Sequence, residues 1–513
     1  MNQREHWASR IGLVLAMAGS AVGLGNFLRF PVQAAGNGGG AFMIPYFAAL
    51  ILLAVPLMWA EWAMGRFGGV RGHGTTPGIF KLLWPGRISK YLGVLGIAFP
   101  LTVLIWYTYV ESWTLAYSYF SLTGAYAGIE TREKMAQFLG NFLGGGGYTT
   151  AYIFFIITIL LNFVVIYRGI TRGIEALAKI AMPILFLFAV ILVIRVFTLR
   201  GITPEHPDWN VINGLAFLWN PRFEKLGDLR IWLAAAGQVF FTLSLGYGVI
   251  QTYASYVRKN DDIALSGLAT TATNEFAEVV LGGSLAIPLA FAFFGPVAMS
   301  EIAKAGAFDL GFMSMPIVFG HLPLGGLLGA LWFGLLFFAG ITSSVSLAQP
   351  AVTFLEDELG WSRKKSSISL FVLVFIACQF VIFGKGFLDE LDFLSGTAGI
   401  VLFAAIEVII FAWIFGMERG WEEITSGADI RVPRIFYYVL KYVTPLYLIG
   451  VLVGFIIQQG FDVITLNGTP PEQIPWKWGA RALVFGLIVA MIILVRFSKR
   501  LREEVVNGES GND

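Results

Sequence analysis

Five side chains with neutral oxygen atoms stand out in a sequence that is otherwise strongly apolar. Asn26, Thr242 and Asn274 carry amide or hydroxyl oxygens, and Thr342 and Ser343 carry two adjacent hydroxyls. Such hard, uncharged oxygens suit a hard cation such as sodium. Any one of them could equally be an ordinary polar residue in helix packing, so the prediction of cation binding depends on where they lie.

Two glycine-rich stretches coincide with these oxygens. Gly19–Phe27 reads GSAVGLGNF, and Phe241–Gly248 reads FTLSLGYG. Because glycine inside a helix costs about 1 kcal/mol relative to alanine, each stretch predicts an interrupted helix. Backbone groups freed by an interruption need partners within the protein when the surroundings are apolar. A matched pair of interruptions indicates a binding site between them, with small-residue helix packing as the alternative.

A zwitterionic amino acid would suit this arrangement. Its carboxylate could accept hydrogen bonds from N–H groups near Leu24 and Gly25, where a second half-helix begins. Its ammonium could meet carbonyl groups near Ala21, Phe241 and Thr242. The interruptions therefore favour an amino-acid substrate with sodium beside it.

The elements that must position these residues are membrane-spanning helices. Of 513 residues, 57% are apolar and 13% are charged, and the mean hydropathy is +0.72. Soluble domains carry about 25% charged residues, whereas repeated runs of about 20 apolar residues indicate spanning helices. We predict an all-α polytopic membrane protein with twelve transmembrane helices, of which the first and sixth are broken. The predicted spans are 10–36, 40–69, 87–123, 149–167, 174–197, 229–257, 264–293, 325–358, 366–384, 387–412, 435–459 and 476–497.

Lysine and arginine gather in alternate loops, for example at Arg71, at Arg168 and in the run 363–365. Positive residues favour the cytoplasmic side, so we expect both termini in the cytoplasm and the protein in the cell inner (plasma) membrane. The first residues resemble a signal peptide, but the apolar sequence continues beyond Ala16–Ala18, where cleavage would occur. We therefore expect this segment to be the start of the first span.

Composition excludes several other classes of function. A net charge of +2 provides no footprint for nucleic acid, and the single cysteine, Cys378, excludes a disulfide framework or a cysteine metal cluster. We predict no enzyme, because the four histidines form no His-Glu-x-x-His motif. The remaining rivals are a proton-coupled or uncoupled amino-acid exchanger, which the sodium dependence of uptake would separate, and an ion channel, which single-channel conductance would reveal.

Seven motifs carry a resemblance that extends over nearly all predicted spans. They are Arg4–Trp7, Gly19–Pro31, Glu61–Arg66, Gly72–Pro77, Tyr107–Trp113, Ala254–Lys259 and Gly340–Ser344. Together they resemble the neurotransmitter:sodium symporter family. The resemblance implies one transporter domain over residues 1–513. Its parts would be a five-helix repeat at 10–197, an inverted second repeat at 229–412, and two peripheral helices with a cytoplasmic tail at 413–513.

The resemblance also implies which residues bind ions and substrate. A first sodium site would use Ala21, Asn26, Thr242 and Asn274, completed by the substrate carboxylate. A second sodium site would use Gly19, Val22, Ala339, Thr342 and Ser343. The substrate pocket would comprise Ala21, Gly25, Val103, Tyr107, Phe241, Thr242, Ser244, Tyr247, Ser343 and Leu347, with Tyr107 and Phe241 as its lid.

Two sets of gating residues are expected on either side of that pocket. An outer gate would pair Arg29 with Asp392 through water. An inner gate would comprise Arg4, Asp357, Tyr256, Ser255 and Gln349. Alternate opening of the two gates would produce alternating access.

The expected function is sodium-coupled symport of neutral, hydrophobic, leucine-like L-amino acids. Tyr247 and Leu347 depart from the phenylalanine and isoleucine of leucine-transporting members of the family, so the preferred amino acid stays open. Ser20 replaces an asparagine beside the first interruption. The transport stoichiometry and the choice between a monomer and a homodimer also stay open.

Glu278 lies four residues after Asn274, so the two side chains share one helical face. A buried carboxylate is costly unless a cation or hydrogen bonds compensate, and we expect sodium nearby with donors from Tyr46, Gln238 and Thr242. Animal members of the family are chloride-dependent and carry serine at the matching position, so Glu278 is expected to replace chloride. It could return protonated, which would give proton antiport. A structural carboxylate is the alternative, and this is the role expected for Glu61, Glu111 and Glu407.

Overall fold

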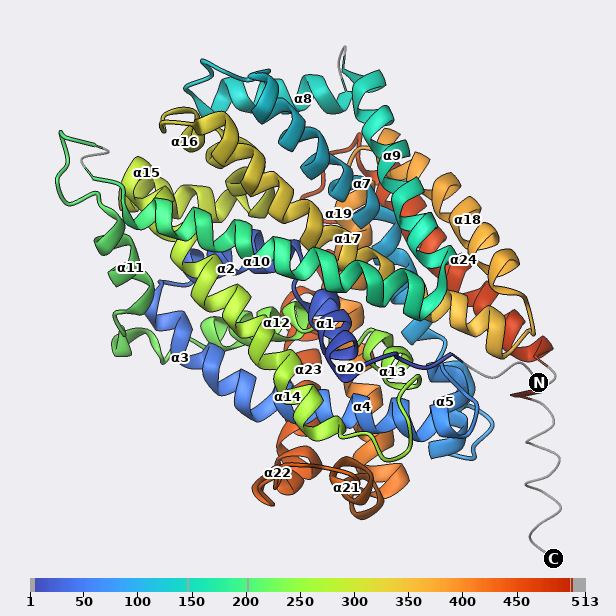
Figure 1. Ribbon diagram of the computed structural model, residues 1–513. Helices are drawn as coiled ribbons and strands as arrows, with labels where there is room; N and C mark the ends of the chain where they lie inside the picture. Colours follow the sequence, from blue (N-terminus) through green and yellow to red (C-terminus); the bar gives the residue numbers. More distant parts are fainter. Residues whose placement is uncertain (1–4, 145–146, 201–202, 499, 502–513) are drawn as a thin grey trace, which may run out of the picture.

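The computed structural model describes residues 5–144, 147–200, 203–498 and 500–501. All regular structure in these residues is helical (Figure 1). The helices are α1 (Arg10–Ala21), α2 (Phe30–Gly36), α3 (Gly40–Ala49), α4 (Val55–Val70), α5 (Thr76–Leu83), α6 (Ser89–Leu92), α7 (Leu95–Thr123), α8 (Arg132–Gly144), α9 (Tyr148–Tyr167), α10 (Ala176–Phe197), α11 (Val211–Trp219), α12 (Leu229–Thr242), α13 (Val249–Ala254), α14 (Ile263–Glu275), α15 (Gly283–Ala305), α16 (Met315–Gly320), α17 (Gly325–Asp357), α18 (Arg363–Phe383), α19 (Phe387–Leu391), α20 (Ile400–Ile409), α21 (Met417–Thr425), α22 (Ile435–Tyr438), α23 (Thr444–Thr465) and α24 (Ile474–Phe497).

The predicted multi-pass, all-α architecture is confirmed. Ten helices of the described chain are long and apolar enough to cross a membrane, and α1 with α2, bent by 48° at a break, makes an eleventh. The broken pair α12 and α13 stands where the sixth span is predicted. Each of the twelve predicted spans therefore has a helical counterpart.

Two predicted spans end too early. The helix predicted at 264–293 continues to Ala305, and the one predicted at 387–412 continues to Thr425. Each contains a glycine with positive φ, Gly295 at 75° and Gly416 at 100°, where the chain changes direction without ending the run of helical bonds. The predicted ends are too early because they follow the end of the apolar run. The helical hydrogen bonds of the backbone continue beyond that point.

Large apolar side chains cover the outer faces of the peripheral helices. Leu160 on α9, Leu187 on α10 and Ile376 on α18 each expose more than half of their surface, at 54%, 57% and 55%. Soluble proteins rarely expose contiguous apolar surface of this kind, whereas lipid tails match it. The outer surface therefore agrees with a multi-pass membrane protein.

The first break lies at the centre of the bundle. Helix α1 contacts α10, α14 and α17, and Figure 1 shows it in the middle of the molecule. At Val22 the backbone becomes extended, and helical structure resumes at Gly25 as a π-helical turn that leads into α2. The N–H of Leu24, freed by the break, donates to the Tyr107 hydroxyl of α7 at 3.1 Å.

The second break separates α12 from α13. Ser244, Gly246 and Gly248 all have positive φ, at 55°, 72° and 70°. A Cβ at Gly246 would collide with the Ile400 carbonyl oxygen. The N–H of Gly246 donates to Glu61 Oε1 of α4 at 2.8 Å. Each break is thus held by a side chain from another helix, as an apolar environment requires.

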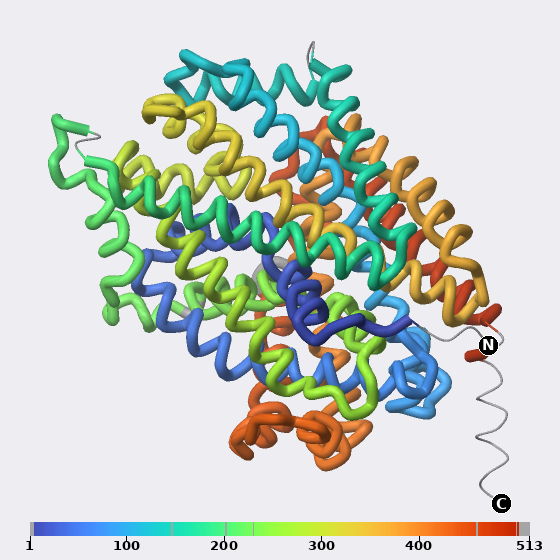
Figure 2. Tube along the Cα trace, in the orientation of Figure 1, coloured from blue at the N-terminus to red at the C-terminus, as the bar shows by residue number. Residues whose placement is uncertain are grey.

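Both described ends of the chain lie on one side of the molecule (Figure 2). Glu5 accepts the N–H of Ile170 at 2.7 Å, and Arg500 donates to the Asp357 carbonyl at 3.2 Å. We call this face, which includes residues 5–9, 255–262 and 357–363, the terminal side. The opposite side carries α8, α11 and α16 (Figure 1).

The second break should not tolerate a side chain at Gly246. A left-handed backbone costs a non-glycine residue about 1–2 kcal/mol, and the collision with Ile400 adds to this. We expect Gly246→Ala to lower the thermal unfolding temperature of the detergent-purified protein. Gly237→Ala is the matched control, because Gly237 lies inside α12 with nothing within 4 Å of an added Cβ. An equal effect of the two substitutions would contradict this account of the break.

Candidate functional site

A cavity of about 40 Å³ lies between the two breaks. It is lined by Ser20, Ala21, Gly23, Gly25, Asn26, Val103, Tyr107, Phe241, Thr242, Ser244, Tyr247, Ser343 and Leu347. All ten residues predicted for the substrate pocket are in this set. Ser20, Gly23 and Asn26 join them, so side chains from α1, α7, α12 and α17 meet at one point.

Phe241 lines the cavity and packs against Gly25. Its Cε1 atom lies 2.7 Å from the position that a Cβ on Gly25 would occupy, so only glycine leaves space for the ring. The guanidinium carbon of Arg29 stacks on the other side, 4.0 Å from the ring centroid. The Phe241 ring therefore lies between the cavity lining and the Arg29 guanidinium.

The three polar side chains predicted for the first sodium site, Asn26, Thr242 and Asn274, come together with Glu278. All four are buried. Asn26 Nδ2 donates to Asn274 Oδ1 at 2.8 Å, to Thr242 Oγ1 at 3.1 Å and to Glu278 Oε2 at 3.1 Å. Asn26 Oδ1 accepts the N–H of Gly23 at 2.8 Å. A half-turn of this amide would present its oxygen to the cluster instead, which is the orientation that a cation needs.

Glu278 is surrounded by hydrogen-bond donors. Its Oε1 atom accepts from Gln238 Nε2 at 2.9 Å and from the Tyr46 hydroxyl at 3.1 Å. Its Oε2 atom accepts from the Thr242 hydroxyl. All three predicted donors are therefore in place. Among the described residues Glu278 forms no ion pair, although it is completely buried. If this carboxyl is ionised it needs a positive partner, and otherwise it must carry a proton, since burying an uncompensated charge costs several kcal/mol.

A second carboxylate lies beside Glu278 and was not predicted. Glu275 accepts from the Tyr46 hydroxyl at 2.8 Å and from Asn274 Nδ2 at 3.3 Å. Tyr46 thus bridges both carboxylates. The sequence could have indicated Glu275, because it directly follows Asn274 on the same helix and its side chain can still reach the neighbouring face.

Four of the five residues predicted for the second sodium site, Gly19, Ala339, Thr342 and Ser343, meet where α17 packs against α1. Ser343 Oγ lies 3.3 Å from both the Gly19 and the Ser20 carbonyl oxygens. Thr342 Oγ1 donates to the carbonyls of Phe338 and Ala339 at 2.9 and 3.2 Å. Gly19 packs against Thr342, and Val22 is buried one turn further along the chain. This is a second concentration of neutral oxygens.

Ser20 links the two breaks. Its hydroxyl donates to Ser346 Oγ at 2.8 Å, and its carbonyl accepts from Ser244 Oγ at 2.9 Å. Ser244 is the residue with positive φ in the second break. Neither contact with Ser20 is visible in the sequence, because the partners are more than 220 positions away.

The predicted outer gate pair lies above the cavity. Arg29 and Asp392 are within electrostatic range of each other, but no ion pair between them occurs in the described residues. Arg29 Nη1 is buried without a hydrogen-bond partner in the same part of the chain. The water-mediated contact between the two groups stays a prediction.

Two of the residues predicted for the inner gate, Tyr256 and Gln349, are bonded to each other on the terminal side, and Arg4 lies outside the described residues. Gln349 Nε2 donates to the Tyr256 hydroxyl at 3.1 Å and to Thr353 Oγ1 at 2.9 Å. Arg363, which was not predicted, donates to Gln349 Oε1 at 3.0 Å. Ser255 and Asp357 lie at the ends of α13 and α17, beside this network.

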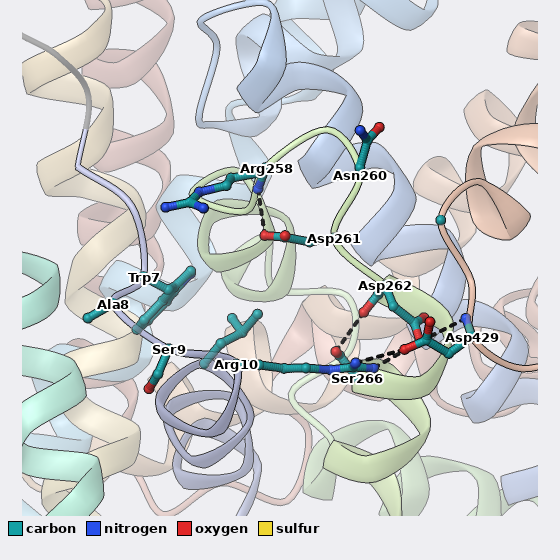
Figure 3. Close-up of a pocket in the computed structure, with 12 residues that line it drawn as sticks. Trp7, Ala8, Ser9, Arg10, Arg258, Asn260, Asp261, Asp262, Ser266 and Asp429 are labelled. Atoms are coloured by element: carbon teal, nitrogen blue, oxygen red, sulfur yellow. Dashed lines mark hydrogen bonds and ion pairs between the residues drawn. The ribbon is translucent and has the colours of Figure 1, made fainter.

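The N-terminal segment, residues 5–9, packs on the same side. Trp7 Nε1 donates to the Tyr253 carbonyl at 3.0 Å. Arg10 reaches from the start of α1 to Asp262 and Asp429, at 2.8 Å each, along a polar cavity of about 300 Å³ (Figure 3). The hydrogen bond from Arg10 lowers the pKa of the Asp429 carboxyl below its ordinary value. Arg10 thereby ties α1 to two loops that the sequence does not place near it.

The three carboxylates predicted to be structural are completely buried. Glu61 holds the second break, and Glu407 accepts from Gln251 at 2.7 Å. Glu111 accepts from Asn162 Nδ2, at 3.1 Å to one carboxylate oxygen and 3.2 Å to the other. Each therefore has a hydrogen-bonded place between helices.

Comparisons with known proteins agree on one family. The profile described as the sodium:neurotransmitter symporter family matches residues 4–136 and 145–503. A sodium-dependent transporter of Bacillus subtilis is 32% identical over 88% of this chain and 97% of its own length. One from Methanocaldococcus jannaschii is 29% identical over 96% of this chain and 97% of its own.

A solved structure and an animal relative extend the comparison. The crystal structure of MhsT in complex with L-phenylalanine superimposes with a TM-score of 0.75. The two sequences are 29% identical, and the superposition covers 88% of this chain and 99% of MhsT. The sodium- and chloride-dependent glycine transporter 1 of Xenopus laevis is 26% identical, over 89% of this chain and 78% of its own length.

The network around Gln349 should hold the terminal side closed. We expect Gln349→Leu, which removes its bonds to Tyr256, Thr353 and Arg363, to raise several-fold the rate at which a thiol reagent modifies a cysteine at Ala254. Ala254 is completely buried, and the assay uses a Cys378→Ala background. Gln379→Leu is the matched control on α18. Equal modification rates in the two variants and the parent would contradict a gating role.

Proposed function

The chain belongs to the sodium:neurotransmitter symporter family, and from this we propose that its sodium-dependent transport carries neutral, hydrophobic L-amino acids. The observation that carries the proposal is the lining of the cavity between the breaks. Val103, Leu347 and the aromatic rings give it apolar walls, and no side chain of Asp, Glu, Lys or Arg is part of the lining. An ionised substrate side chain would lose its hydration there without gaining a partner.

The breaks supply partners for the two charges that all such substrates share. The N–H groups at Leu24 and Gly25 begin the second half of the first broken helix and would receive the carboxylate. The Tyr107 hydroxyl already accepts from Leu24, and it could turn to donate to the carboxylate. Carbonyls near Ala21 and Phe241 would receive the ammonium. The solved complex of MhsT with L-phenylalanine supports a substrate of this class.

Two sodium ions would bind beside the substrate. The first would lie among the oxygens of Ala21, Asn26, Thr242 and Asn274, and the second among those of Gly19, Val22, Ala339, Thr342 and Ser343. The hydrogen bonds that join these groups support the assignment, since they already bring neutral oxygens together. Both clusters include the first break, so either ion would fix α1 against its neighbours.

Alternating access would follow from the two closures. The outer closure would open by separation of Arg29, Phe241 and Asp392. The inner closure would open by separation of Tyr256, Gln349 and the N-terminal segment. In this structure Phe241 lines the cavity, and Gln349 is bonded to Tyr256 in the terminal network. The terminal side would face the cytoplasm of the inner membrane, given its lysine and arginine content. The two halves, 10–197 and 229–412, would move as inverted repeats, in a monomer or a homodimer.

Glu278 would supply the negative charge that chloride supplies in relatives described as chloride-dependent. Its four hydrogen-bond donors suit a carboxylate, and sodium at Asn274 would provide the missing positive charge. Transport would therefore be independent of chloride. After sodium leaves, a proton on Glu278 would neutralise the site during the return step.

Sodium-dependent binding is the direct test of this function. We expect a neutral hydrophobic L-amino acid such as leucine to bind at least about fivefold more tightly in sodium than in potassium or choline, the usual range for coupled sites. Glutamate and lysine should compete poorly because the cavity lining carries no charge to pair with them. Equal affinity in the three cations would instead favour an uncoupled exchanger.

Glu278→Ser should make transport depend on chloride. The substitution removes the carboxylate and leaves a space lined by Gln238, Tyr46 and Thr242, which can donate to an anion. We expect proteoliposome uptake by this variant to be stimulated by chloride over gluconate, whereas the parent responds equally to both. Glu275→Ser is the control, because it retains Glu278. A parent protein that already requires chloride would refute the proposal.

A further inference from the structure

The Tyr247 hydroxyl is a buried polar group that lacks a partner. Tyr247 is 3% exposed, and its oxygen has no hydrogen bond to any residue that the structure describes. Its ring is part of the cavity lining. A buried hydroxyl left unsatisfied is costly, so this atom has reason to bind whatever enters the cavity.

Two other polar groups lie near this hydroxyl. Tyr247 is within electrostatic range of both Arg29 and Asp392. A Cβ at Gly396 would collide with Asp392 Oδ1 and lie 3.7 Å from the Tyr247 oxygen, which places both oxygens around one glycine. Arg29 Nη1, also buried, lacks a partner among the described residues as well. The Tyr247 hydroxyl therefore belongs to the cavity lining, whereas the Asp392 carboxylate and the unused N–H donor of Arg29 lie near it but outside that lining.

We propose that Tyr247 is a specificity-determining residue that selects neutral L-amino acids whose side chain ends in a hydroxyl, with tyrosine preferred over phenylalanine. The proposal rests on the proposed function and names a substrate class within it. A substrate hydroxyl could accept from Tyr247 or Arg29 and donate to Asp392, so both of its hydrogen-bonding capacities would be used. An apolar side chain of the same shape would leave the Tyr247 hydroxyl unpaired.

Phenylalanine and tyrosine form a suitable pair of probes because they differ by this one hydroxyl. The apolar side chains of the lining, Val103, Leu347 and Phe241, offer no hydrogen bond that could distinguish the two. One added neutral hydrogen bond corresponds to about fivefold in affinity. We expect tyrosine to compete about fivefold better than phenylalanine for sodium-dependent binding to the wild-type protein.

The experiment measures this ratio in three proteins in the presence of sodium. In Tyr247→Phe the ratio should fall to about one or invert, because the hydroxyl of tyrosine then enters an environment with one fewer partner. Tyr117→Phe is the matched control, since Tyr117 on α7 is also completely buried with no hydrogen-bond partner among the described residues, but it is not part of the cavity lining. It should keep the wild-type ratio.

The possible failures separate the two proposals. A wild-type preference for phenylalanine, or an unchanged ratio in Tyr247→Phe, would overturn the role of Tyr247 alone. Binding of leucine without binding of tyrosine would do the same. Absence of sodium-dependent binding for every neutral amino acid tested would overturn the proposed function, and the role of Tyr247 with it.

Discussion

Backbone N–H and C=O groups in an apolar environment must find partners within the protein, and this constraint shapes the centre of the molecule. An unbroken helix satisfies them internally, whereas a break needs polar side chains from elsewhere. Tyr107 of α7 accepts from Leu24 at the first break, and Glu61 of α4 accepts from Gly246 at the second. Tyr107 and Glu61 are therefore buried polar residues that the breaks require.

The same breaks bring together atoms that could bind ions and an amino acid. Ser20, through its hydroxyl and its carbonyl, joins α1 to Ser346 of α17 and to Ser244 of the second break. On one side of this junction lie Asn26, Asn274 and the buried carboxylate of Glu278. The protein supplies Glu278 with hydrogen bonds but with no ion pair in the described residues, so an ionised Glu278 would need a cation at this point.

Motifs and the properties of single residues predicted much of this arrangement. The ten predicted pocket residues line one cavity, and Tyr46, Gln238 and Thr242 surround Glu278. The contacts that were missed depend on how distant segments meet. Arg10 and Asp429 are separated by 419 positions, and no periodicity in either segment records their pairing. Helix ends at Ala305 and Thr425 were missed because glycines with positive φ turn the chain while hydropathy simply declines.

The central claim is that sodium binds at the two oxygen clusters around the breaks. It is tested most directly by equilibrium binding of radioactive sodium to the purified protein with saturating substrate, in the wild type, in Asn274→Ala and in the double variant Thr342→Ala with Ser343→Ala. The account predicts two ions per wild-type chain and the loss of one ion in each variant. Retention of the wild-type number of ions in both variants would contradict it.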